Sequence, residues 1–200
     1  MFNIIIFGPP GSGKGTQSSR VAARYHMAHI STGEYFRKEV QKDSKIGEKS
    51  KYYIDKGLLV PDEIVLKELY RMVHRFDKTK GFILDGFPRT LYQAKMLDRF
   101  LSKKDIPLNM VIYINVKAQE LFQRMMGRGT DSGRSDDKES IILKRMKIYK
   151  IQTQPLLDYY KYQDKIMCVS GMAPVGEVSQ KISSIIDQYL EQNKILLRNQ

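Results

Sequence analysis

The sequence contains one cysteine, Cys168, in 200 residues. A single thiol excludes an intramolecular disulfide framework and a zinc cage built from several cysteines. It also indicates a reducing compartment, so we expect a cytoplasmic protein. Cys168 stands within the apolar residues 166–169, and this predicts that its side chain packs in the core and does not act as a nucleophile.

Long apolar segments are also missing. No stretch approaches the roughly 20 residues that span a bilayer, and residues 1–7 lack the basic region that opens a signal peptide. We therefore expect neither a membrane anchor nor a signal peptide. Internal repeats and linkers are absent as well, which predicts a single domain over residues 1–200.

Acidic residues are fewer than basic ones. The chain has 22 Asp and Glu against 34 Lys and Arg, and its net charge is +12. This excess fits either nucleic-acid binding or a polyanionic small substrate combined with a lysine-rich surface. The lysines are scattered, and no zinc-finger or RNA-recognition spacing occurs. Both observations weaken the nucleic-acid explanation.

Short apolar runs alternate with segments of helical pattern along the chain. The runs lack strict alternation of apolar and polar residues, so they predict an α/β fold with a five-stranded parallel sheet and helices on both faces. We expect strands over residues 4–7, 29–30, 82–84, 110–114 and 166–169. We expect helices over 14–25, 33–42, 46–56, 61–76, 90–102, 118–126, 137–161 (kinked at Pro155) and 178–190.

Two excursions leave this core, over residues 31–60 and 127–137. Both start at the carboxyl side of strands, where ligands of open α/β sheets bind. The first is polar and lysine-rich. The second contains glycines and arginines but almost no apolar side chain, which predicts a mobile loop.

A glycine-rich segment, GPPGSGKGT at residues 8–16, follows the first apolar run. Glycines allow successive N–H groups to turn around a phosphate, Lys14 adds a positive charge, and the helix that starts here adds its positive end. The segment fits the phosphate-binding pattern G-x-x-x-x-G-K-[ST], except that Gly15 takes the last position and Thr16 follows it. The segment predicts a site for a nucleoside triphosphate.

An acid and several arginines surround this predicted site. Asp85 ends the apolar run 82–84, where P-loop proteins place an acid near the magnesium shell. It can act through water, because magnesium keeps several waters. Arg89 follows on a short turn and can grip a phosphate with two parallel bonds. Further arginines surround the second excursion and suggest a clamp for several phosphates: Arg124, Arg128, Arg134 and Arg145.

With these residues assembled, the chain resembles the adenylate kinases of the nucleoside-monophosphate kinase superfamily. Four blocks carry the resemblance, in the family's order and over residues 1 to about 174. They are residues 8–16; Ser31, Thr32, Gly33 and Glu34 with Arg37; DGFPRT at 85–90 with Gln93; and SGRSDD at 132–137 with Arg145.

The resemblance implies a P-loop three-layer fold and reversible phosphoryl transfer from MgATP to AMP, giving two ADP. It implies a core of residues 1–30, 61–126 and 138–193, a helical insertion that binds the nucleoside monophosphate over 31–60, and a short lid over 127–137. A lid of this length without cysteine implies no zinc. The expected partners are ATP, AMP, ADP and Mg²⁺, and the expected state is a monomer with no obligatory nucleic acid.

The resemblance also implies roles for individual residues. The ATP site would consist of Gly11, Ser12, Gly13, Lys14, Gly15, Thr16, Arg124, Arg128 and Ala173. The AMP site would consist of Thr32, Arg37, Leu58, Leu59, Val60, Gly86, Phe87, Pro88, Arg89, Gln93, Arg134 and Arg145. The catalytic set would be Lys14, Asp85, Arg89, Arg124, Arg134 and Arg145. The three histidines, His26, His29 and His74, lie outside these blocks, and we expect structural roles for them.

Three alternatives remain at this stage. A UMP/CMP kinase shares the short lid and the SGR-x-DD pattern, but Thr32, Thr90 and Gln93 resemble the AMP-specific type. A GTP-dependent switch would need an Asn-Lys-x-Asp reader, and the nearest match, NKIL at 193–196, ends in leucine. A nucleic-acid-associated P-loop NTPase would use the +12 charge and would bind with a steep salt dependence.

Overall fold

The structure is a computed structural model that describes residues 1–75, 81–132 and 135–194, with residues 129–132 and 135 described by their backbone alone. The end of the expected helix 61–76, Arg134 and the last six residues lie outside this part. Within it, no helix combines the length and the apolar character that crossing a membrane requires.

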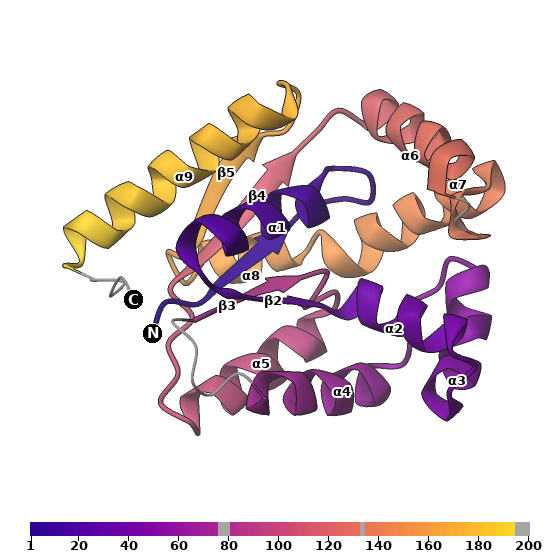
Figure 1. The fold of residues 1–200 in the computed structure, drawn as a ribbon, viewed down its shortest axis with the longest axis horizontal. Helices are drawn as coiled ribbons and strands as arrows, with labels where there is room; N and C mark the ends of the chain where they lie inside the picture. Colours follow the sequence, from indigo (N-terminus) through magenta and orange to yellow (C-terminus); the bar gives the residue numbers. More distant parts are fainter. Residues whose placement is uncertain (76–80, 133–134, 195–200) are drawn as a thin grey trace.

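A parallel sheet forms the centre, and within the described residues it has five strands in the order β2-β3-β1-β4-β5 (Figure 1). All four pairings are parallel, as the apolar runs predicted. The strand that precedes the glycine-rich segment is therefore central. The bounds are β1 Ile4–Phe7, β2 Ala28–Ser31, β3 Phe82–Asp85, β4 Met110–Asn115 and β5 Ile166–Ser170.

Helices cover both faces of the sheet. Their bounds are α1 Lys14–Tyr25, α2 Thr32–Gln41, α3 Lys45–Asp55, α4 Asp62–His74, α5 Leu91–Ser102, α6 Ala118–Ser132, α7 Glu139–Ile148, α8 Leu156–Lys161 and α9 Val175–Gln192. The described residues also include two short helical turns, the 3-10 helix η1 Ser135–Asp137 and the π-helical η2 Tyr149–Thr153. In Figure 1, α2 and α3 stand beside the sheet, below α6 and α7.

Two apolar cores lie on opposite faces of β1, because successive side chains of a strand point to opposite sides. Ile4 and Ile6 pack with residues of α1, α6 and α9. Ile5 and Phe7 pack with residues of α4, α5 and α8, including the fully buried Leu69. Each such buried leucine contributes about 1.5–3 kcal/mol relative to an exposed one. The two cores fix the glycine-rich segment from both sides.

The long helix expected over 137–161 is interrupted near Pro155. The proline has no N–H to donate and its ring crowds the carbonyl of Ile151. The preceding turn widens, and the Gln154 N–H bonds the Tyr149 carbonyl oxygen at 2.8 Å, five residues back. The expected kink is thus confirmed as a π-helical turn between α7 and α8.

Two expectations are wrong. α6 continues to Ser132, although residues 127 onward were expected to form a loop. Cys168 is exposed and not buried. β5 is an edge strand, and its successive residues alternate: Val169 is buried on the face that α9 covers, while Cys168 points to the other face, which is open at this position.

Candidate active site

A cavity opens at the carboxyl ends of β1 and β3, between the glycine-rich segment, the α2–α3 insertion and the α7–η2 segment. This is the end of the sheet that the sequence predicted for ligands. The cavity gathers most of the expected AMP residues together with Lys14. They are Thr32, Arg37, Leu58, Leu59, Val60, Gly86, Phe87, Pro88, Arg89, Gln93 and Arg145.

The glycine-rich segment turns sharply from β1 into α1. Gly11 and Gly13 have φ values of +82° and +86°, a region that glycine enters without steric cost. A Cβ on Gly11 would lie 2.9 Å from the carbonyl oxygen of Leu121, so a side chain does not fit there. A Cβ on Gly15 would lie 3.4 Å from Asp85 Oδ2. A side chain at this position would therefore be in van der Waals contact with the carboxylate of Asp85.

Lys14 begins α1, and its Nζ donates a hydrogen bond to the Pro9 carbonyl oxygen at 3.3 Å. Burial lowers the pKa of Lys14 to about 7. The carboxylate of Asp85 opposes this effect, while the charges of Arg89 and Arg145 lower the pKa further. The free lysine therefore loses its charge near neutral pH, and a bound polyanion would favour the charged form strongly.

Asp85 ends β3 and is buried, as its position after the apolar run predicted. Burial by itself raises the pKa of this carboxyl, but the contact with His29 and the charge of Lys14 outweigh it, and the pKa is lowered overall. His29 Nε2 lies 3.5 Å from Asp85 Oδ2. The parallel pairing of β2 with β3 brings His29 beside Asp85, although it lies outside the sequence motifs, and its structural role stays a prediction.

Two guanidinium groups converge beside Gly33. A Cβ on Gly33 would lie 3.2 Å from Arg89 Nη2 and 3.4 Å from both terminal nitrogens of Arg37. Arg89 is held in place because its Nε donates to the Gly86 carbonyl oxygen at 2.8 Å, and Thr32 Oγ1 donates to the same oxygen at 3.0 Å. Burial lowers the pKa of Arg89. A pair of converging guanidiniums is suited to bind a dianionic phosphate.

Arginines and acids of the α6–α7 region form ion pairs. Arg128 makes two bonds of 2.7 Å to the carboxylate of Asp137. Arg145 lies 2.9 Å from Asp136 Oδ2 and 2.8 Å from Asp137 Oδ1. Asp137 is fully buried, which gives these bonds a low-dielectric setting. Both acids belong to the SGRSDD motif at residues 132–137, but nothing in the sequence indicates that they pair with these arginines.

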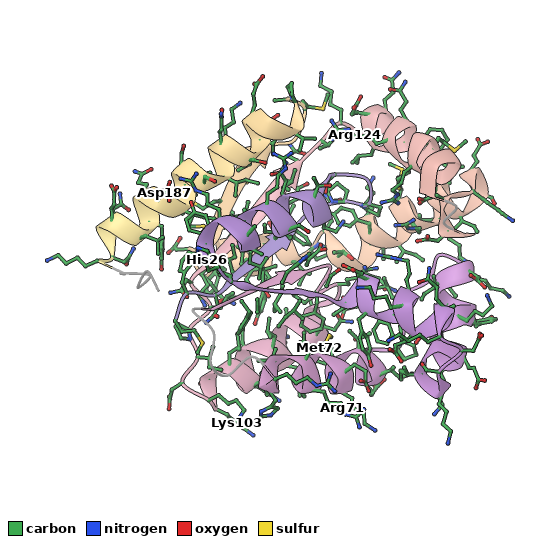
Figure 2. All side chains as sticks on the ribbon, in the orientation of Figure 1. His26, Arg71, Met72, Lys103, Arg124 and Asp187 are labelled. Atoms are coloured by element: carbon green, nitrogen blue, oxygen red, sulfur yellow. The ribbon has the colours of Figure 1, made fainter. Side chains whose placement is uncertain are left out.

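Some expected residues lie away from the cavity wall. Arg124 Nε lies 2.7 Å from Glu120 Oε1, and its Nη2 donates to the Gly171 carbonyl oxygen at 2.9 Å, on the side of α6 that faces the sheet (Figure 2). Arg124 and Arg128 belong to α6, and Ala173 lies in the turn after β5. Arg134 lies outside the described residues.

The cavity also has an apolar wall that the sequence motifs did not indicate. It comprises Phe36, Ile54, Val65, Ile148 and Tyr149. These residues come from α2, α3, α4, α7 and η2, so only the fold brings them together. A flat aromatic or aliphatic surface of this kind suits a nucleobase.

Comparison with known proteins agrees with this geometry. The adenylate kinase family model matches residues 6–165. An adenylate kinase from Bacteroides thetaiotaomicron is 41% identical over 188 residues, which cover 94% of this chain and 100% of that protein. Adenylate kinases from Flavobacterium psychrophilum and a Cyanothece species are 40% and 39% identical, over 94% of this chain and 99% and 96% of those proteins. The chain belongs to the adenylate kinase family.

Proposed function

We propose that the protein transfers the terminal phosphoryl group of MgATP reversibly to AMP, giving two ADP. The observation that carries the proposal is the second phosphate site. Arg37 and Arg89 converge beside Gly33 in the same cavity as Lys14 of the glycine-rich segment. An NTPase that binds a single nucleotide does not need a pair of guanidinium groups in addition to its glycine-rich segment. A nucleotide kinase does, because it must hold two phosphorylated substrates facing each other.

On the donor side, the backbone of the glycine-rich segment would hold the ATP phosphates through Gly11, Ser12, Gly13, Lys14, Gly15 and Thr16. The helix α1, which starts at Lys14, adds the positive end of its dipole. Arg124 would contact the phosphates, Arg128 would pack on the adenine, and Ala173 would offer its backbone carbonyl.

Asp85 fits a role beside magnesium. Asp85 is the last residue of β3 and lies next to Gly15 and Lys14. Its carboxylate is ionised and offers the hard oxygen ligand that magnesium prefers. Asp85 would hold the ion through a water molecule. When bound, the ion neutralises charge on the triphosphate. Among the residues that the structure describes, no group of three or more His, Cys, Asp or Glu forms a metal cage, and the proposal includes no zinc.

On the acceptor side, Arg37 and Arg89 would grip the AMP phosphate. Leu58, Leu59 and Val60 would line the nucleoside, with the segment Gly86, Phe87 and Pro88 opposite and Gln93 reading the base. All of these side chains or backbones border the cavity. The hydrogen bonds of Thr32 and Arg89 to the Gly86 carbonyl oxygen keep this turn rigid.

During transfer, an oxygen of the AMP phosphate attacks the terminal phosphorus of ATP, and the bond to the bridging oxygen of ADP breaks. Lys14, Arg89, Arg134 and Arg145 would balance the charge that spreads over the phosphoryl oxygens. Residues 127–137 would act as a short lid that excludes water, which would otherwise accept the phosphoryl group.

The test is turnover of MgATP with a panel of monophosphates, followed by identification of the products. We expect AMP to be the best acceptor and ADP to be the only product in that reaction. Faster turnover with CMP or UMP would favour a UMP/CMP kinase instead. Retention on DNA or RNA that falls steeply with salt would add a nucleic-acid function.

We infer further that the protein works as a cytoplasmic monomer. The single cysteine in the sequence supports a reducing compartment, and the resemblance to the family supports the monomer. Light scattering with chromatography would give about twice the mass of 23.2 kDa if the protein were a dimer.

A further inference from the structure

The side-chain amide of Gln93 is held from two sides. Gln93 is in α5, is 1% exposed, and lines the cavity. Its Oε1 accepts a hydrogen bond from the Arg89 N–H at 2.7 Å, and its Nε2 donates one to Asp62 Oδ1 at 2.7 Å. A backbone N–H can only donate and a carboxylate can only accept. The oxygen and nitrogen of the amide therefore cannot exchange places.

Asp62 is itself fixed by its neighbours. It is the first residue of α4, and its Oδ2 accepts a hydrogen bond from Thr90 Oγ1 at 2.9 Å. Thr90 caps α5, since its Oγ1 accepts the Gln93 N–H at 3.1 Å. The two carboxylate oxygens of Asp62 thus accept hydrogen bonds from the Thr90 hydroxyl and from the Gln93 side-chain amide. Removing the carboxylate would take this acceptor from both groups.

We propose that Asp62 is a positioning residue that sets the choice of base, by fixing the orientation of the Gln93 amide. This inference rests on the proposed function and adds to it the residue that acts through Gln93. With one N–H and one lone pair already used, the amide has one N–H on Nε2 and one lone pair on Oε1 left for a ligand.

A donor next to an acceptor matches the edge of a 6-amino purine. Adenine offers its N1 as an acceptor and its 6-amino group as a donor. A 6-keto purine offers the reverse, because its N1 carries a hydrogen and its oxygen only accepts. If the amide of Gln93 could turn over, it would fit either edge. The Arg89 N–H opposes this turn at Oε1, and the carboxylate of Asp62 opposes it at Nε2. Asp62 thereby adds to the preference for AMP over inosine monophosphate (IMP), which carries an oxygen in place of the 6-amino group.

A purely structural role for Asp62 makes a different prediction. An acid at the first position of a helix stabilises that helix through its dipole. Loss of that effect would lower stability and would reduce turnover with every acceptor by the same factor. Glu63, the next residue in the same first turn, is exposed and provides the matched control.

The experiment compares kcat/KM for AMP and for IMP with MgATP. The proteins are the wild type, Asp62→Ala, Asp62→Asn and Glu63→Ala, with thermal unfolding to verify the fold. We expect the ratio of AMP to IMP to fall about fivefold to tenfold in Asp62→Ala, as for loss of one of the two hydrogen bonds that orient the amide. Asp62→Asn keeps an oxygen that accepts from Gln93 and should stay within about threefold of the wild type. Glu63→Ala should leave the ratio unchanged.

If Asp62→Ala does not fold, a second variant, Asp62→Ser, tests the same inference. Asp62→Ser keeps a residue that favours a helix start, but its hydroxyl donates as well as accepts and so fixes no orientation. The same loss of ratio is expected there. In a Gln93→Ala background, Asp62→Ser should have no further effect on the ratio, because the two residues act as one unit.

Two results would overturn the inference. One is an unchanged ratio in Asp62→Ser, as when turnover with AMP and with IMP falls by the same factor. The other is the same loss of ratio in the Gln93→Ala background. Each of them leaves the proposed function intact if the wild type prefers AMP. A wild-type protein without that preference would instead refute the proposed acceptor, and this inference with it.

Discussion

Lys14 gives a quantitative prediction about proton uptake on ATP binding. Its pKa is lowered to about 7 by burial, with Arg89 and Arg145 adding to the effect. At pH 8 a lysine with this pKa is about 90% neutral, and at pH 6 about 10%. The phosphates of ATP restore its charge. Binding of MgATP should therefore take up about 0.9 proton at pH 8 and about 0.1 at pH 6.

The sign of the pH effect follows directly. Because the complex carries one more proton than the free protein above pH 7, affinity for MgATP falls as pH rises, by up to about tenfold per pH unit between pH 7 and 10. Calorimetric titration in two buffers of different ionisation enthalpy, without AMP, measures the uptake. Lys14→Arg is the control, since arginine stays charged over this range.

Two results would refute this reasoning. Uptake below about 0.2 proton at pH 8 would mean that Lys14 is already charged in the free protein. Equal uptake in Lys14→Arg would assign the proton to another group.

Three further predictions concern the arginines and their supports. Arg89→Ala should lower kcat by about a thousandfold or more while circular dichroism stays unchanged, because a charge that faces the phosphoryl group is lost; near-normal turnover contradicts its role. Asp137→Ala should lower the free energy of unfolding in urea by about 3 kcal/mol, since Arg128 and Arg145 lose a buried partner; Glu63→Ala, an exposed acid, should change it little. Gly57→Ala should lower kcat/KM for AMP about tenfold to a hundredfold, because φ is +64° and the new Cβ would lie 2.7 Å from Ile141 Cγ2; wild-type kinetics would show that this junction tolerates a side chain.

The core of the fold and the phosphate segment could be predicted from the sequence. Central strands such as residues 4–7 are buried on both faces and therefore apolar throughout. The residues of a strand do not by themselves determine its position within the sheet. The apolar run at 166–169 looks buried, but β5 lies at the edge, and so Cys168 is exposed.

The end of α6 shows a second limit. Residues after Gly127 have few apolar side chains, and this composition predicts a loop. The helix continues beyond Gly127, and in this region ion pairs such as that between Arg128 and Asp137 form. Such pairs depend on residues that meet only in the fold, and a count of apolar positions does not detect them.

Some residues of the candidate site could be identified from the sequence, and others could not. Residues within short motifs, such as Lys14 and Arg89, carry their chemistry in local sequence. His29 and Asp62 contact partners that lie 56 and 31 residues away in the sequence, Asp85 and Gln93. Only the pairing of β2 with β3 and the packing of α4 beside α5 bring those partners together.

The exposure of Cys168 makes the protein ready for single-site labelling. It is the sole cysteine of the sequence, and it lies on a strand of the central sheet. A fluorophore attached there needs no prior removal of other thiols. The substitution Tyr52→Cys, at an exposed position of α3, would give a second site for a dye. Energy transfer between the two dyes would then follow the distance between sheet and insertion during turnover.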